Sequence, residues 1–421
     1  MPLSTAAPIV VVGAGIVGVC AATYLRRDGH DVTLVDMNAP GEGASFGNAG
    51  CLNGSSVVPV AMPGTWKSVP GWLMDPLGPL AIRWSYLPAL APWLWRFLRA
   101  ATPEKVEAQA KALRPLLAPS VDTYRDLLRD AGAEHLVHRV GHLFAYRTRA
   151  GFDKDTTAMA LRERNGVKID ALGADELRQL EPHLSRDFQH GRLVSENGHC
   201  ENPHAMVNAL AEALVRQGGA VRRAKVTGFV QDGGKVTAVR TEAGDIACAG
   251  VVLAAGAWSK PLAKALGDSL PLDTERGYHV MIENPEVAPR VPTMDCDLKA
   301  VATPMATGLR IAGTVEFAGI AAPPNWGRAD KLLTVARAMY PTLPADVAPS
   351  RLKKWMGFRP SMPDSLPVID RARGAANAWY AFGHGHVGLA AGAMTGRLVA
   401  DLVGGRTPVI DPAPYTARRF D

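Results

Sequence analysis

A strand, a glycine-rich turn and a helix open this chain, and their order constrains its fold more than any other feature. Residues 8–12 form an apolar run typical of a buried strand, Gly13-Ala14-Gly15-Ile16-Val17-Gly18 follows directly, and residues 19–27 predict a helix. A second β-rich run, residues 31–35, ends on Asp36, 18 residues after the last glycine of the motif. This strand–turn–helix–strand unit is typical of proteins that bind a dinucleotide.

The positions of the motif each have a physical reason. Gly13 permits the tight turn, Gly15 lets the backbone approach a pyrophosphate, and Gly18 lets the helix pack closely on the strand. Free N–H groups at the helix start meet the phosphate charge, while Asp36 accepts hydrogen bonds from a ribose 2′-OH. Glycines of an ordinary turn are the alternative interpretation. The residues expected at the dinucleotide are Gly13, Gly15, Ile16, Val17, Gly18 and Asp36.

Length and composition indicate a packed protein of two domains. At 421 residues the chain exceeds one ordinary core, and its 47% hydrophobic and 20% charged residues are normal for a globular enzyme. The apolar run 9–25 follows no basic residue and is explained by the glycine motif, while the run 87–95 is too short to span a membrane. Five cysteines without CxxC spacing predict neither a disulfide framework nor a metal site, which fits a reducing cytoplasm.

The net charge of +6 is spread over the chain without a basic run, so nucleic acid is not an expected partner. A modest positive field suits an anionic substrate or an acidic membrane surface, and peripheral contact with the inner face of a membrane stays open beside a cytoplasmic location. For a Trp-rich segment the alternatives are ordinary packing, a pocket lid or a membrane-touching surface, and packing is favoured. Its tryptophans are Trp66, Trp72, Trp84, Trp93 and Trp95.

A second glycine motif near the end of the chain indicates which dinucleotide binds. Gly383-His384-Gly385-His386-Val387-Gly388 lies between a strand at 379–382 and a helix that ends at residue 403. A second nicotinamide site needs a further strand ending in an acid, and the residues up to Asp421 leave no room for one. We therefore expect a helix N-terminus directed at the cofactor, where it stabilises the negative charge of a reduced flavin. This favours FAD over NAD.

Signals of the cofactor domain occur at both ends and in the middle of the chain, which predicts two interleaved domains. A meander with turns at 233–234 and 243–244 is expected over residues 221–253, and strands over 276–320. We expect an α/β fold, in which a Rossmann-like FAD-binding domain is interleaved with an α+β substrate domain built on an antiparallel sheet. The FAD-binding domain comprises residues 1–55, 195–270 and 355–421, and the substrate-binding domain comprises 56–194 and 271–354.

Several further motifs carry a resemblance to a known family. They are Ser45-Phe46-Gly47-Asn48-Ala49-Gly50, Ala254-Ala255-Gly256-Ala257-Trp258-Ser259, Gly277-Tyr278 and Gly357-Phe358-Arg359-Pro360, together with the motif at Gly383. Over its whole length the chain resembles the FAD-dependent amine oxidoreductases, which include D-amino-acid dehydrogenases, glycine oxidases and sarcosine oxidases. Residues 41–54, 273–279, 313–319 and 354–369 are most similar to glyphosate oxidoreductases.

The resemblance implies roles for two residues of the substrate site, and strand alternation adds a third. Arg359 corresponds to the arginine that clamps the substrate carboxylate, and a guanidinium fork is well suited to that pairing. Tyr278 corresponds to an active-site tyrosine that bonds the carboxylate or closes the pocket. Strand alternation puts Arg276 on the face of Tyr278, as a second cation for a dianionic substrate, and His279 on the other face. The alternative for Arg359 is a structural arginine, for Tyr278 a half-buried strand aromatic, and for Arg276 a solvated strand residue.

The resemblance also implies contacts with the flavin. His384 lies at the expected helix start beside the flavin, and His386 is a candidate for the same pocket or a structural histidine. No cysteine occurs in residues 357–362, where sarcosine oxidases attach FAD covalently, so non-covalent FAD is expected. The cofactor residues implied here are Ser45, Asn48, Ala49, Gly50, Val226, Ala255, Gly256, Trp258, Arg359, Gly383, His384, Gly385, His386, Val387 and Gly388.

The expected reaction is oxidation of the C–N bond of a small anionic amine by hydride transfer to flavin N5, followed by imine hydrolysis. An N-substituted glycine is the leading substrate, as in glyphosate oxidoreductases. A D-amino acid, converted to a 2-oxo acid and ammonia, is the alternative, and a non-catalytic flavin-binding subunit is a second alternative. Electrons then pass to a quinone, a dye or oxygen.

Overall fold

The sheet built around the glycine-motif strand is parallel except at one edge. The computed structural model describes residues 7–64 and 80–421. The strands of this six-stranded sheet follow the order β10 (Ala220–Arg223), β2 (Val32–Asp36), β1 (Ile9–Val12), β14 (Gly250–Leu253), β21 (Ala378–Phe382) and β20 (Val368–Arg371). Only the edge strand β20 pairs antiparallel. Since β1 lies inside the sheet, the turn after it opens at the carboxyl edge of parallel strands, where such folds bind nucleotides.

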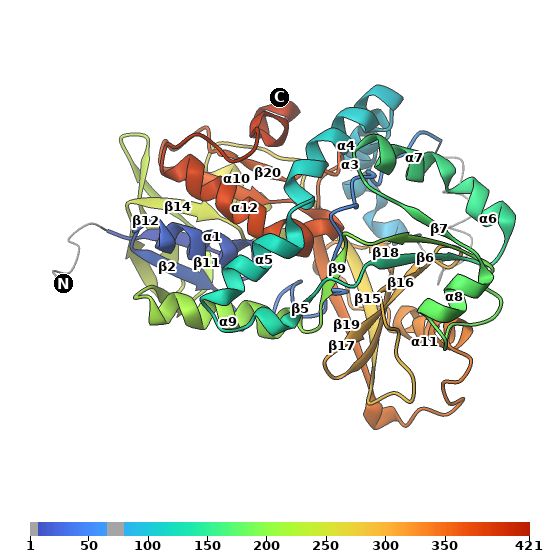
Figure 1. The fold of residues 1–421 in the computed structure, drawn as a ribbon. Helices are drawn as coiled ribbons and strands as arrows, with labels where there is room; N and C mark the ends of the chain where they lie inside the picture. The colour runs from blue at the N-terminus through green and yellow to red at the C-terminus, as the bar shows by residue number, and fades with distance from the viewer. Residues whose placement is uncertain (1–6, 65–79) are drawn as a thin grey trace.

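Helices with small residues cover one face of this sheet. Helix α1 (Ile16–Arg27) packs along α12 (Gly388–Val403), and α9 (Pro203–Arg216) and α5 (Ser120–Arg129) pack beside them, as Figure 1 shows. The close contact of α1 with α12 requires a small residue, because a Cβ on Gly396 would lie 2.6 Å from the backbone of Cys20. Both helices begin at the same edge of the sheet, so their N-termini are directed toward the same site.

A three-stranded meander covers the other face. It consists of β11 (Val226–Asp232), β12 (Lys235–Thr241) and β13 (Gly244–Ala247), with its first turn at residues 233–234. Val236 and Val239 pack on the β1 and β14 side chains that point away from the helices. The predicted meander is therefore present, but residues 220–223 and 250–253 at its expected ends belong to the parallel sheet instead, since their side chains are needed in that core.

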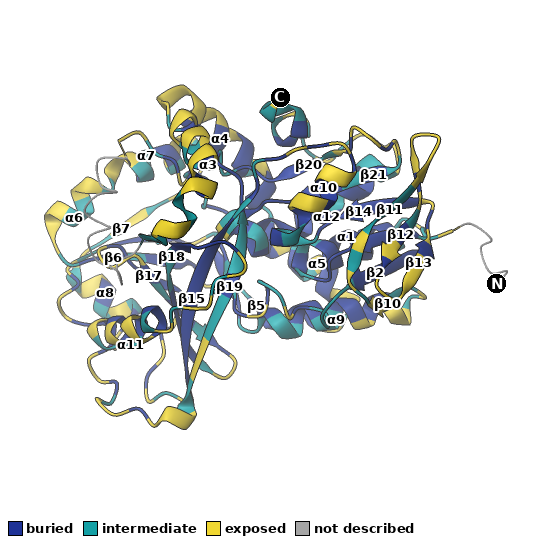
Figure 2. Ribbon diagram, turned by 180° about the vertical axis from the view of Figure 1, so that it is seen from behind, coloured by how far each residue is buried: buried dark blue, intermediate teal, exposed yellow. Residues whose placement is uncertain are grey.

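The second large sheet has nine strands, most of them antiparallel. Its order is β19 (Leu352–Ser361), β15 (Asp273–Glu283), β18 (Gly308–Phe317), β17 (Ala300–Met305), β16 (Thr293–Asp295), β6 (His142–Tyr146), β8 (His190–Val194) and β7 (Asp170–Leu172), with β4 (Leu80–Ile82) paired to β18. Helix α11 (Gly327–Met339) packs on β15 and β18. Residues 274–282 of β15 are all buried, so β15 is the central element of this part of the molecule (Figure 2).

The expected division into two domains stays a proposal, and three elements contact both parts. The parallel sheet takes strands only from 1–55, 195–270 and 355–421, whereas β19 crosses the proposed boundary at 355. Helices α4 (Pro103–Leu117) and α5 come from the proposed substrate segment, yet they pack on α12. Pro119 lies between these two helices and directly precedes α5.

The described part of the Trp-rich segment includes one buried tryptophan. Trp93 on α3 (Leu87–Ala100) packs against Phe97 and Phe317, which confirms packing for this residue, whereas Trp84 and Trp95 are exposed. Trp66 and Trp72 lie outside the described residues. Within residues 7–64 and 80–421, no helix has the length and apolar character needed to cross a membrane.

Candidate cofactor and substrate site

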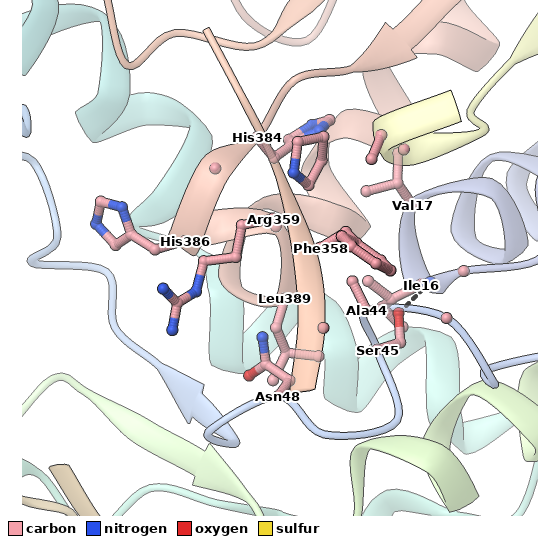
Figure 3. A pocket seen from close by; sticks show the side chains of 18 of the residues that line it. Ile16, Val17, Ala44, Ser45, Asn48, Phe358, Arg359, His384, His386 and Leu389 are labelled. Atoms are coloured by element: carbon pink, nitrogen blue, oxygen red, sulfur yellow. Dashed lines mark hydrogen bonds between the residues drawn. The ribbon is translucent and has the colours of Figure 1, made fainter. Parts of the chain in front are cut away.

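One cavity of about 720 Å³ connects the two large sheets. Its wall includes Gly13 at the end of β1. Figure 3 shows other parts of the wall: the loop with Ser45 and Asn48, Arg359 on β19 and His386 before α12. A volume of this size is within the range of ligand-binding pockets in proteins. The two glycine motifs, which are far apart in the sequence, therefore meet at the same cavity.

The N-terminal motif is shaped for the phosphates of a dinucleotide. Gly13 has a φ of +110°, and a Cβ there would lie 2.3 Å from the carbonyl oxygen of Ala254, so the turn requires glycine. A Cβ on Gly15 would make an ordinary contact with Ser45 Oγ at 3.5 Å and would clash with no other residue. Ile16 N donates to Ser45 Oγ at 3.0 Å, which fixes the 45–49 loop at the start of α1. The bare backbone around Gly15 fits a bound pyrophosphate.

Asp36 lines the same end of the cavity and is held by the backbone. Its carboxylate accepts hydrogen bonds from Ala14 N at 2.7 Å and Asn38 N at 2.9 Å. Val226 lies in the wall beside Asp36, and Ala255, Gly256 and Trp258 form the wall next to it. Because each carboxylate oxygen has two lone pairs, Asp36 keeps acceptor capacity for a ribose hydroxyl. These residues fit the adenosine half of the cofactor.

Three glycines predicted to contact the cofactor do not line the cavity. Gly18 lies at the crossing of α1 and the turn, where a Cβ would meet the carbonyl oxygen of Gly13. Gly50 stabilises its own loop, since its N–H donates to Asn48 Oδ1 at 2.9 Å and its carbonyl accepts from Cys200 N. Gly383 has a φ of +86° and makes the turn before His384. Each of these glycines shapes the wall rather than forming it.

The second motif brings the N-terminus of α12 to the cavity. Gly385, His386, Val387 and Gly388 lie in the wall, and no side chain caps the helix at Val387. His384 is buried and its Nε2 lies 2.9 Å from Thr395 Oγ1; burial lowers the pKa of His384 to about 3, so it is neutral. The uncapped N–H groups and the positive end of the helix dipole can stabilise negative charge on a bound ring.

Arg359 is the best-placed cation for an anionic substrate. Its Nη1 donates to the carbonyl oxygen of Thr314 at 3.2 Å, and its guanidinium lies over Gly277, where a Cβ would come within 2.3 Å of Nη2. Burial lowers the pKa of Arg359, while the charge of Glu275 raises it. Among the described residues no carboxylate comes within 4 Å of the Arg359 guanidinium, so its remaining N–H groups are available to a ligand.

Arg276 and Tyr278 share one strand face, as expected, but that face does not present them to a substrate. The Arg276 side chain is fully buried, does not line the cavity, and donates to the carbonyl oxygens of Gly319, Ala322 and Pro323. Tyr278 belongs to the wall, but its hydroxyl donates to Glu316 Oε2 at 2.6 Å and accepts from Asn325 N at 3.0 Å. The expectation that Arg276 is a second cation of the pocket is therefore not supported, because its donors are already occupied.

The substrate end also contains residues that the sequence analysis missed. Arg162 on α7 (Thr156–Arg164), His142 and Phe144 on β6, and Lys299 all line the cavity. The His386 side chain is accessible from the cavity, and the protein walls around it desolvate the ring. This desolvation, and then the charges of Arg359 and Arg162, lower the pKa of His386 to about 4. Arg162 carries no local signal in the sequence, since it lies in an ordinary charged helix and reaches the cavity only through the tertiary fold.

His279 anchors the loop over the cavity from the opposite face of β15. Its Nδ1 lies 2.9 Å from the carbonyl oxygen of Gly47, and its ring stacks on Trp355 at 5.2 Å between centroids. Across the part of the chain that the structure describes, no cluster of three or more His, Cys, Asp or Glu side chains is arranged to hold a metal ion.

Comparisons with known proteins agree with these features. A family model described as "DAO: FAD dependent oxidoreductase" matches residues 8–402. The chain is 51% identical over 415 residues, which is 98% of both chains, to a Bradyrhizobium diazoefficiens protein named D-amino-acid oxidase. It is 32% identical, again over 98% of both chains, to a D-amino acid dehydrogenase of that organism. The solved glycine oxidase of Geobacillus kaustophilus has a TM-score of 0.73 at 21% identity, covering 97% of this chain and 98% of that one.

Proposed function

The chain belongs to the family of FAD-dependent oxidoreductases, and on this premise we propose that it oxidises D-amino acids whose carboxylate is bound by Arg359. Members of this family act on amino acids or amines, and the chain uses FAD for the same class of reaction. The observation that carries the proposal is the guanidinium of Arg359 in the cavity wall, which has no carboxylate of the described chain within 4 Å. A guanidinium fork binds a carboxylate through two parallel hydrogen bonds and so fixes the orientation of the adjacent Cα.

Each part of the wall has a role in this reaction. Bound FAD would supply the acceptor for a hydride from the substrate Cα, and the imine formed from the substrate would be hydrolysed by water to a 2-oxo acid and ammonia. Arg359 holds the carboxylate and limits the substrate to one orientation. The N-terminus of α12 stabilises negative charge, and His386 presents a neutral imidazole that can accept or donate a hydrogen bond. The protein thus supplies binding and electrostatics.

The names of the relatives favour a D-amino acid over an N-substituted glycine as the first candidate. The relatives at 51% and 32% identity are named for activity on D-amino acids, and they match nearly the whole chain. A secondary amine with two anionic groups, of the glyphosate oxidoreductase type, is the second candidate. The observation that favours this candidate is a second guanidinium, that of Arg162, in the same cavity.

We also propose that FAD is held without a covalent bond. Of the cysteines in the described chain, Cys51 alone lines the cavity, and burial raises the pKa of its thiol to about 12. A protonated thiol is a poor nucleophile. Acid precipitation should therefore release free FAD into the supernatant, whereas yellow colour in the pellet would refute this part of the proposal.

The electron acceptor and the location of the protein in the cell form a further part of the proposal. We expect a quinone or dye to accept electrons faster than oxygen, in a cytoplasmic protein that touches the inner face of the membrane. Relatives named dehydrogenases and the net charge of +6 support this, as do the exposed Trp84 and Trp95 near Arg96 and Arg99 on α3. Stoichiometric hydrogen peroxide formed at the rate seen with dye would contradict the claim about the acceptor. No binding to anionic vesicles would contradict the claim about the membrane.

The test of the proposed reaction is anaerobic reduction of the bound flavin by a panel of amines. D-alanine should bleach the yellow flavin, L-alanine should be far slower, and ammonia and pyruvate should appear in equal amounts. Bleaching by L-amino acids alone would contradict the D-preference. A chain that binds FAD but is bleached by none of these amines would favour the alternative of a non-catalytic flavin-binding subunit.

A further inference from the structure

We propose that Arg162 is a second anion-binding residue of the substrate site, which selects amines that carry two anionic groups. This inference rests on the proposed function, because it assigns a side-chain preference to the same amine-oxidising site. It concerns the part of the cavity wall to which α7, β6 and the Arg359 strand β19 contribute.

The position of Arg162 makes it a partner of Arg359. The two arginines come from segments almost 200 residues apart, yet both side chains line the one cavity. His386, which projects into this cavity, is influenced by the charges of both guanidinium groups. The pKa of His142 on β6 is lowered by burial and also by the charge of Arg162. Both cations therefore act on the same part of the cavity, at the end away from the glycine motif.

The hydrogen bonds of Arg162 leave part of its guanidinium free. Nε donates to the carbonyl oxygen of Ser55 at 3.2 Å, Nη1 lies 3.6 Å from Met159 Sδ, and the Phe144 ring lies 5.0 Å from Cζ. Arg276 is different, because Nε, Nη1 and Nη2 all donate to carbonyl oxygens. In the described chain no carboxylate lies within 4 Å of Arg162, while the exposed Arg164 on the same helix pairs with Glu107. Arg162 thus lacks the counter-ion that its helix neighbour has.

The charge of the wall requires an anion at this place. Among the described wall residues the one carboxylate is that of Asp36, which lies at the cofactor end. The cations are Arg162, Arg359, Lys299 and Lys225, of which Lys225 pairs with Glu242. Burial lowers the pKa of Arg162, although the charge of Asp155 acts in the opposite direction. A buried charge without a counter-ion is costly in free energy. An anionic group of a ligand beside Arg162 would therefore strengthen binding. A substrate with one carboxylate satisfies Arg359 alone.

The chemistry of the second group follows from the guanidinium. Carboxylates and phosphonates both offer two oxygens to a planar fork of N–H donors. The substrates that fit are compact amines with two such groups: D-aspartate and D-glutamate, with the second group on the side chain, or iminodiacetate and N-phosphonomethylglycine, with the second group on nitrogen. All four substrates are amines with two anionic groups. The experiment distinguishes a second group on the side chain from a second group on nitrogen.

The test compares Arg162→Gln, Arg162→Lys and the control Arg164→Gln as FAD-loaded enzymes. For each, kcat/KM is measured with D-alanine and with the four dianionic amines. We expect Arg162→Gln to lower the ratio of dianion to D-alanine kcat/KM by ~10- to 100-fold, the effect of one charged hydrogen-bonded contact. Arg162→Lys should recover part of the ratio, since it keeps the charge without the fork, and Arg164→Gln should keep the wild-type ratio.

A binding measurement without turnover complements the kinetics. Malonate and acetate cannot be oxidised at a C–N bond, so calorimetry reports their affinity for the FAD-loaded enzyme alone. Malonate should bind more tightly than acetate, and Arg162→Gln should remove most of that difference. Equal affinities, or a difference that survives Arg162→Gln, would overturn the inference.

The outcomes separate this inference from the proposed function. If D-alanine bleaches the flavin while the dianions show no preference and no dependence on Arg162, the inference fails and the proposed function stands. If none of the amines bleaches the flavin, both fail. The substrates that lose most on Arg162→Gln identify the second group as a side-chain or a nitrogen substituent.

Discussion

At the cofactor end of the cavity the wall is mostly backbone, whereas at the substrate end it consists of long side chains. Gly13, Gly15 and the turn at 254–256 leave bare peptide groups around the expected phosphates. Arg359, Arg162 and His386 instead reach into the cavity from three separate elements. The backbone end can bind one kind of cofactor in many relatives, while the side-chain end can change its substrate by single substitutions.

The largest expected effect tests the backbone end. In Gly15→Val the Cβ contacts Ser45 Oγ at an ordinary 3.5 Å, so the fold should persist, while the side chain occupies the place expected for the phosphates. The purified variant should be colourless, with at least ~10-fold less flavin per chain, as measured by absorbance. Gly228→Ala, on an open strand position, is the control that should stay yellow. A yellow Gly15→Val protein would mean that the phosphates bind elsewhere.

A second prediction concerns stability at the buried face of β15. Arg276→Gln leaves three carbonyl oxygens and Glu316 without the guanidinium, and breaking such a buried pair costs about 3–5 kcal/mol. Denaturant unfolding should show this loss, whereas Lys353→Gln on the exposed part of β19 should show little. If stability is unchanged and only dianion affinity falls, Arg276 reaches the substrate and our description of this face is wrong.

Tyr278→Phe should have a smaller effect of the same kind. The change leaves Glu316 Oε2 and Asn325 N without the phenol hydroxyl, which costs about 1–3 kcal/mol in unfolding free energy. We expect KM for D-alanine to change much less than in Arg359→Ala. A large rise in KM with unchanged stability would return Tyr278 to the role of a carboxylate contact.

A last prediction concerns a loss of stability in mild acid. Burial, the first cause in each case, lowers the pKa of His142, His279 and His384 to about 3 and of His199 and His386 to about 4. Unfolded histidines titrate near pH 6.5, so the unfolded chain binds more protons below that pH, and stability falls as pH drops from about 6.5 toward 4. Thermal unfolding at pH 7.5 and 5.5 tests this, and a Tm that rises in acid would contradict it.

The difference between the two ends also explains what the sequence could predict. The cofactor end follows from contiguous motifs whose geometry is local, so the turn at Gly13, the acid at Asp36 and the start of α12 were all foreseen. Alternation placed Arg276 and Tyr278 correctly on one face, but only the packing of α11 and the 319–325 loop decides that this face is covered. Arg162 was missed because its approach to Arg359 depends on long-range packing of α7, for which no residue pattern exists.

The most direct test of the central claim, that Arg359 anchors the substrate carboxylate, is anaerobic flavin reduction by D-alanine in wild type, Arg359→Ala and Arg359→Lys. The account predicts that Arg359→Ala keeps its flavin spectrum but binds D-alanine ~10- to 100-fold more weakly, with a slower reduction step from misorientation. Arg359→Lys should recover only part of the affinity, since a point charge lacks the planar fork. Normal binding and reduction in Arg359→Ala would contradict the account and place the carboxylate anchor on another residue.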